Sequence, residues 1–150
     1  MNMPTPTEDK VEIQEIMHRY AFMVDNHKWD QMDKIFAPGA NVDYVSSGGQ
    51  KGPYKKTLAW LKRALTPWPL NLHFISNAII EIDVDTATSS VVYHAPMGRI
   101  EENGSQTMMT NIGYYHDQWK RLNGEWRIMN RVCEQTITIG GLPQNYKIPG

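Results

Sequence analysis

The chain has 150 residues with 15 basic and 16 acidic side chains, so its formal net charge is -1. This length is typical of one domain, and the balanced charge excludes both the basic footprint of a nucleic-acid-binding protein and a polybasic membrane patch. No apolar segment is long enough to span a bilayer, and the N-terminus does not resemble a signal peptide. A single cysteine suits a reducing compartment. We therefore expect one cytoplasmic domain over residues 1–150 that acts on a small molecule.

Three helices are predicted in the first half of the chain. Apolar residues spaced by three and four predict a helix over residues 7–24, with Thr7 as its N-terminal cap. A second, shorter helix over residues 29–36 is expected to end at the Ala-Pro-Gly sequence of residues 37–39. A third helix is predicted over residues 54–65, with prolines on both sides of it.

The second half of the chain has the period-two pattern of strands. After a short strand at residues 41–45 and the third helix, tight turns separate four longer strands, over residues 72–83, 87–100, 107–122 and 126–139. Helices followed by an antiparallel meander indicate an α+β domain in which a curved sheet wraps around the helices. Residues 140–150 are expected to be irregular and to lie across a pocket or a neighbouring subunit.

The strand over residues 72–83 is apolar on both of its faces. One alternating set is His73, Ile75 and Ile79, and the other is Phe74, Ile80 and Ile82. A sheet that is buried on both faces needs two covers, and the helices supply one of them. We expect a second subunit to supply the other, so the prediction is a homo-oligomer, either a dimer or a trimer.

Two residues stand out from this pattern. Asp25 follows the last apolar position of the first helix, where the macrodipole disfavours a carboxylate. His73 opens a long apolar strand, where a buried imidazole needs a hydrogen-bond partner. Taken singly, Asp25 is explained as the cap of a turn and His73 as a core histidine. Together they are the carboxylate and histidine that proton transfer requires, and we expect them to form one site.

Further residues are candidates for the same site. Tyr20 lies on the apolar face of the first helix and is a candidate acid if its hydroxyl reaches a cavity. Arg131 lies within an apolar strand face, so it needs an anion, either from the substrate or from an intramolecular salt bridge. Asn77 either orients a substrate oxygen or pairs with backbone in a bulge. The candidates to contact substrate are Tyr44, Asn77, Tyr115 and Met129.

The sequence contains no metal-binding histidine pair, no nucleotide-binding glycine motif and no nucleophile elbow. We therefore expect chemistry that uses neither a metal nor a cofactor. The catalytic candidates are Asp25, His73, Arg131 and Tyr20.

Several segments together resemble the SnoaL-like branch of the nuclear transport factor 2-like superfamily. They are residues 16–36 (IMHRYAFMVDNHKWDQMDKIF), residues 51–53 (KGP), residues 73–77 (HFISN) and residues 124–128 (GEWRI) with Arg131. The resemblance covers nearly the whole chain. It implies a cystatin-like α+β barrel, in which a cone of curved antiparallel sheet encloses a pocket behind three helices.

Within that superfamily, the chain is similar to the cofactor-independent lyases scytalone dehydratase, bile acid 7α-dehydratase and hexachlorocyclohexane dehydrochlorinase. The resemblance places their Asp–His dyad on Asp25 and His73, and the tyrosine and arginine of the bile acid enzyme on Tyr20 and Arg131. It implies a dehydratase-type elimination, or a related retro-aldol release, on a small aromatic or polycyclic substrate. The alternatives are an isomerase or polyketide cyclase of the ketosteroid isomerase type and a noncatalytic ligand-binding module.

Overall fold

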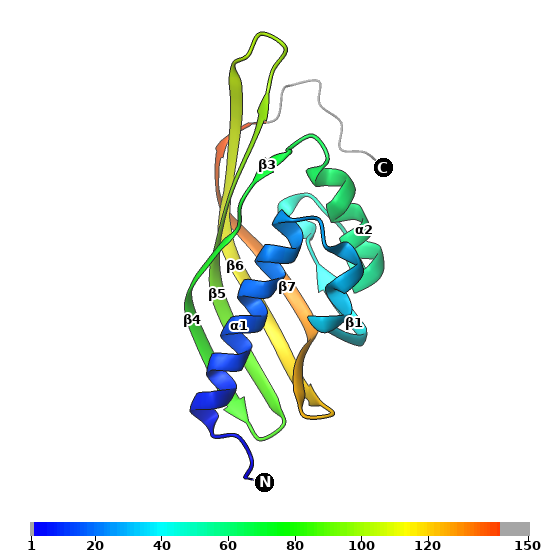
Figure 1. Cartoon of the computed structure of the whole chain (residues 1–150), viewed down its shortest axis with the longest axis vertical. Helices are drawn as coiled ribbons and strands as arrows, with labels where there is room; N and C mark the ends of the chain where they lie inside the picture. Colours follow the sequence, from blue (N-terminus) through cyan, green and yellow to red (C-terminus); the bar gives the residue numbers. More distant parts are fainter. Residues whose placement is uncertain (1, 142–150) are drawn as a thin grey trace.

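The computed structural model describes residues 2–141, so the predicted irregular tail lies, from residue 142 on, outside the described residues. In chain order the elements are α1 (Pro6–Asp25), η1 (Trp29–Lys34), β1 (Phe36–Asp43), η2 (Val45–Ser47), β2 (Lys51–Pro53), α2 (Tyr54–Leu65), β3 (Leu70–Asn71), β4 (Phe74–Asp83), β5 (Thr86–Ile100), β6 (Gln106–Leu122) and β7 (Glu125–Gly140). The three predicted helices, α1, η1 and α2, lie on one side of a large curved sheet (Figure 1). The predicted α+β fold is confirmed. The sheet stays open, with strand order β2-β1-β7-β6-β5-β3 and β4 also paired to β5.

The N-terminal cap of α1 is Thr5, not the predicted Thr7. The Thr5 hydroxyl accepts a hydrogen bond from the Glu8 backbone N–H at 3.3 Å, and the Glu8 carboxylate accepts one from the Thr5 backbone N–H at 2.6 Å. This reciprocal capping box, with Pro6 at the first helical position, sets the start of the helix. The helix ends at Asp25, as the apolar periodicity indicates.

A buried carboxylate near the start of α1 attaches the helix to the sheet. Asp9 is 3 % exposed and accepts hydrogen bonds from Arg121 Nη2 at 2.8 Å and from Trp126 Nε1 at 2.9 Å. Burial opposes the charge on Asp9, but these two hydrogen bonds outweigh it and lower the pKa of the carboxyl group. Because Arg121 and Trp126 flank the β6–β7 turn, they hold α1 along the sheet, and α1 packs against β4.

The segment predicted as the end of the second helix is a strand. η1 is a short 3₁₀ helix, and β1 begins at Phe36, which is fully buried. β1 runs parallel to β7 and pairs Phe36 with Ile128. A register shift follows in this pairing, where Gly39 has φ +78°, so the Pro-Gly sequence bends a strand and does not end a helix. Tyr44, predicted within a short strand, directly follows β1.

A β-bulge in β4 changes which residues face inward. The pairing of β4 with β5 shifts next to Asn77, which has φ +53°. The extra residue moves the later side chains to the opposite faces, so Ile80 is 6 % exposed and Ile79 is 68 % exposed. The predicted faces were therefore wrong beyond the bulge, because Ile80 and Ile82 continue the inward face of Ile75.

The helices leave one face of the sheet uncovered (Figure 1). Large apolar side chains are exposed on its strands. The exposed ones on β4, β6 and β7 include Phe74, Ile79, Tyr114 and Val132. These side chains are exposed in the part of the chain that the structure describes, and a second subunit would cover them. The homo-oligomer stays a prediction. None of the described helices is long and apolar enough to cross a membrane.

Candidate active site

Asp25 and His73 form a hydrogen-bonded pair. Asp25 Oδ1 lies 2.7 Å from His73 Nδ1, and Oδ2 accepts a hydrogen bond from the His73 backbone N–H at 2.9 Å. The exposed fractions of the two side chains are 6 % for His73 and 11 % for Asp25. Helix α1 supplies Asp25 as its last residue, and the link between β3 and β4 supplies His73. The two contacts hold the imidazole with Nδ1 on the carboxylate and Nε2 pointing away from it.

His73 lines a cavity of about 60 Å³, which we call the inner chamber. Tyr44, Tyr93, Tyr115 and Cys133 are also in its wall. Burial raises the pKa of the Cys133 thiol, so it stays protonated and is not a nucleophile. A space of this size holds about two water-sized groups. It accommodates the reacting atoms of a substrate, and the rest of the molecule must lie elsewhere.

The phenols around the inner chamber are hydrogen-bond donors. The Tyr44 hydroxyl lies 2.5 Å from the Tyr20 hydroxyl, and Tyr20 is fully buried behind it. Tyr20 does not line the chamber, so its hydroxyl acts there through Tyr44. Burial raises the pKa of Tyr20, Tyr44 and Tyr115, which keeps all of them protonated at neutral pH.

Arg131 is fully buried and its charge is paired within the chain. Its Nε and Nη2 each donate to a different carboxylate oxygen of Asp117 at 2.8 Å. The guanidinium carbon lies 4.3 Å from the ring centroid of Tyr20 and 4.2 Å from that of Tyr115. Burial opposes the charge, but Asp117 outweighs it and raises the pKa of Arg131. Of the two alternatives for Arg131, the structure therefore has the salt bridge with Asp117, and the guanidinium lies against the rings of Tyr20 and Tyr115.

Two of the candidate substrate contacts lie outside the inner chamber. Asn77 is exposed at the β4 bulge and lines neither the inner chamber nor the space next to it. Met129 is the extra residue of a bulge between β6 and β7, and it lines a separate hollow of about 530 Å³. Both residues lie where an extra residue breaks the alternation of faces, so counting along the strand does not fix their orientation.

The inner chamber opens into a larger space of about 320 Å³, which we call the outer chamber. Leu65, Asn111 and Gln135 are among the residues that line both. Trp60 and Trp68 lie in the wall of the outer chamber, and no charged side chain of residues 2–141 lines it. The site therefore suits an uncharged, apolar molecule.

Sequence reasoning missed Asp117 and Gln135 and assigned no role to Asn111. On β6, Asn111 and Asp117 have the same parity as Tyr115, and all line or support the site. That parity was the available signal for them. Gln135 has the same parity on β7 as Arg131 and Cys133, and the register shift between β6 and β7 comes only after it, at residue 136, so parity was the available signal for it as well.

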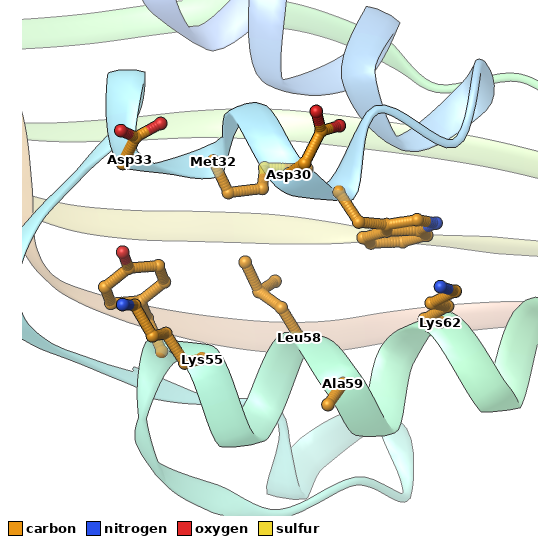
Figure 2. A pocket seen from close by; sticks show the side chains of 9 residues that line it. Asp30, Met32, Asp33, Lys55, Leu58, Ala59 and Lys62 are labelled. Atoms are coloured by element: carbon orange, nitrogen blue, oxygen red, sulfur yellow. The ribbon is translucent and has the colours of Figure 1, made fainter.

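A hollow of about 440 Å³ lies between η1 and α2, and it shares no lining residue with either chamber. In Figure 2, Asp30 and Asp33 lie on η1 at one side of this hollow, and Lys55 and Lys62 lie on α2 at the other side. None of the predicted site residues lines it. In the described part of the chain, no cluster of three or more histidine, cysteine, aspartate or glutamate side chains is placed to hold a metal ion. The Asp25–His73 pair with its two chambers is therefore the candidate active site.

Comparison with known sequences gives two findings. A family model described as a SnoaL-like domain matches residues 5–132. An uncharacterised protein of Mycobacterium tuberculosis, Rv2910c, is 33 % identical over 124 residues, which cover 83 % of this chain and 83 % of that protein.

Several solved structures have the same fold. A protein from Kribbella flavida has a TM-score of 0.79 at 20 % identity, covering 90 % of this chain and 95 % of that one. A candidate scytalone dehydratase from Novosphingobium aromaticivorans has a TM-score of 0.75 at 22 % identity, with 91 % and 89 % covered. A hexachlorocyclohexane dehydrochlorinase, LinA type 2, has a TM-score of 0.74 at 14 % identity, with 95 % of each chain covered. At these identities the likeness concerns the fold.

Proposed function

The chain belongs to the SnoaL-like family, and on this premise we propose that it is a cofactor-independent lyase that eliminates water, or a similar small leaving group, from a small aromatic or polycyclic substrate. Two proteins of the same fold are named for eliminations, a candidate scytalone dehydratase and a dehydrochlorinase. The observation that carries the proposal is the Asp25–His73 pair, whose histidine lines a chamber of protonated phenols.

In the proposed reaction, His73 is the base. Its Nδ1 is held by Asp25, so Nε2 takes a proton from a carbon next to an activating carbonyl or ring. The electron pair of that C–H bond forms the new C=C bond while the C–O bond breaks. The imidazolium, stabilised by the Asp25 carboxylate, then returns the proton to the departing hydroxyl group. Water leaves, and the enzyme is restored to its starting protonation state.

The phenols stabilise the negative charge that develops on oxygen. Tyr44 lines the inner chamber and donates to the oxygen of the enolate or leaving group, while Tyr20 supports its hydroxyl from behind. Such donors are strongest in a cavity that excludes water. In this proposal Tyr44, His73 and Asp25 form the reaction centre, and Tyr20 and Arg131 are positioning residues.

The oligomeric state and the cellular compartment of the protein are also part of what we propose. We expect a homo-oligomer, because the apolar face of the sheet with Ile79 and Val132 is exposed in the single chain. We also expect a cytoplasmic protein, since the single cysteine, Cys133, is free and buried.

The test is turnover of a panel of β-hydroxy carbonyl compounds and aryl alcohols, with products identified by mass spectrometry. The wild type is expected to form a product that has lost water. His73→Ala and Asp25→Asn are expected to lower kcat on the order of 10²- to 10⁴-fold, the usual contribution of a general base.

A second histidine–carboxylate pair supplies the control. His116 Nε2 lies 2.9 Å from Glu134 Oε2 on the uncovered face of the sheet, so His116→Ala is expected to keep the wild-type rate. Turnover that does not respond to Asp25→Asn and His73→Ala would exclude the pair as the proton-transfer group. A product with the mass of the substrate would identify an isomerase in place of a lyase.

A further inference from the structure

Two amide side chains stand where the inner and outer chambers meet. Asn111 on β6 and Gln135 on β7 line both spaces. A substrate with its ring in the outer chamber and its reacting atoms at His73 must pass the junction of the two spaces, which these two amides line together with Ser47, Leu61, Leu65 and Met97. The hydrogen-bonding groups of these amides that have no partner within the chain therefore influence which substrates can bind.

A chain of hydrogen bonds fixes what the amides offer to a ligand. Gln135 Nε2 donates to Thr138 Oγ1 at 2.7 Å, and Thr138 Oγ1 donates to Asn111 Oδ1 at 3.3 Å. A hydroxyl has one proton, so a Thr138 that donates to one amide accepts from the other. This leaves one acceptor, Gln135 Oε1, and one donor, Asn111 Nδ2. Reversing both amides reverses the chain and again leaves one acceptor and one donor.

The acceptor is the unusual member of this pair. Gln135 Oε1 is buried and has no hydrogen-bond partner among residues 2–141. A buried carbonyl oxygen without a donor is destabilising, and such groups in native structures point to an absent ligand or water. Among residues 2–141, no charged side chain lines the outer chamber beside it, so the matching group on a ligand is expected to be neutral.

We propose that Asn111 and Gln135 are specificity-determining residues that bind a hydroxyl group of an uncharged substrate of one or two rings. A hydroxyl donates to Gln135 Oε1 and accepts from Asn111 Nδ2 at the same time, whereas a ketone, an ether or a halogen only accepts. The volume of about 320 Å³ is at the small end of ligand sites and sets the limit of one or two rings. That the other end of the molecule reacts at His73 rests on the proposed function.

Binding of two probes of similar size tests this without any reaction. 2-Naphthol carries a hydroxyl group, and 2-fluoronaphthalene carries a fluorine that donates nothing. Equilibrium dialysis gives the dissociation constant of each, and the wild type is expected to prefer 2-naphthol. Gln135→Met and Asn111→Leu are each expected to reduce this preference about 3- to 10-fold, as loss of one hydrogen bond does.

The matched control is Gln118→Met, an exposed position of β6 that lines neither chamber, and it is expected to keep the wild-type preference. Circular dichroism shows which variants are folded. Because two variants are used, the test can still be made if one of them does not fold. A wild type without preference, or a preference unchanged in a folded Gln135→Met or Asn111→Leu, would overturn the proposal. Asp25→Asn is expected to retain the preference, so failure of the proton-transfer pair and failure of the amide pair give different results.

Discussion

Replacing Asp117 with asparagine is expected to destabilise the protein strongly. Neither side chain of the Asp117–Arg131 pair has exposed surface, and the carboxylate holds two nitrogens of the guanidinium at 2.8 Å each. Asparagine keeps the shape of the aspartate but removes the negative charge beside a buried cation. Arg131 Nη1 already has no acceptor among the described residues, so the remaining partners in the variant are one amide oxygen and the rings of Tyr20 and Tyr115.

The magnitude follows from the burial of the pair. Removing one partner of a buried ion pair costs about 3–5 kcal/mol, a large share of the roughly 5–15 kcal/mol that stabilises a typical domain. With a slope of about 2 kcal/mol per molar urea, a loss of about 4 kcal/mol lowers the urea midpoint by about 2 M. The double variant Asp117→Leu/Arg131→Met is expected to recover part of this loss, because it leaves no unpaired charge.

Urea unfolding followed by tryptophan fluorescence measures the midpoints. The control is Glu134→Gln, which removes a carboxylate from a pair whose side chains are 41 % and 58 % exposed. Its expected effect is below about 1 kcal/mol, as for surface pairs. If Asp117→Asn shifts the urea midpoint no more than Glu134→Gln does, the argument that the buried Asp117–Arg131 pair stabilises the fold is refuted.

Three further outcomes are expected. Gly113→Ala should lower the free energy of unfolding by about 2 kcal/mol in the same urea assay, because a Cβ there collides with the Glu134 backbone carbonyl. A variant as stable as the wild type would show that the backbone shifts there without a cost in stability. The pKa of Asp9 is lowered in the folded state, so its contribution to stability is present above its ordinary pKa of 3.8 and is lost as the pH falls below that value. Thermal melts across this range should show a smaller loss on acidification for Asp9→Asn, and equal pH dependence would contradict the assignment. Sedimentation of the wild type should give a mass that is a multiple of the 17.2 kDa chain mass. Tyr114→Glu, which places a charge on the uncovered face of the sheet, should lower this mass. A single-chain mass for the wild type would exclude the oligomer.

Local patterns in the sequence predicted much of the fold and the centre of the site. The first helix and the four long strands lie close to their predicted bounds, because apolar periodicity and turn residues act within a few neighbouring residues. Asp25 and His73 were identified because each is unusual in its own element, a carboxylate at a helix end and a histidine in an apolar strand. Tyr115 and Tyr44, two of the candidates to contact substrate, line the inner chamber.

Pairing between distant segments decided what the sequence alone did not. One inserted residue beside Asn77 reversed the faces of β4, and another at Met129 did the same on β7, so alternation counted along a strand failed at both. The partner of Arg131 depended on the register that sets Asp117 opposite it across β6 and β7. The sequence by itself therefore determined which residues are chemically unusual. The tertiary structure decided which of them meet, because strand register is set by contacts far apart in the chain.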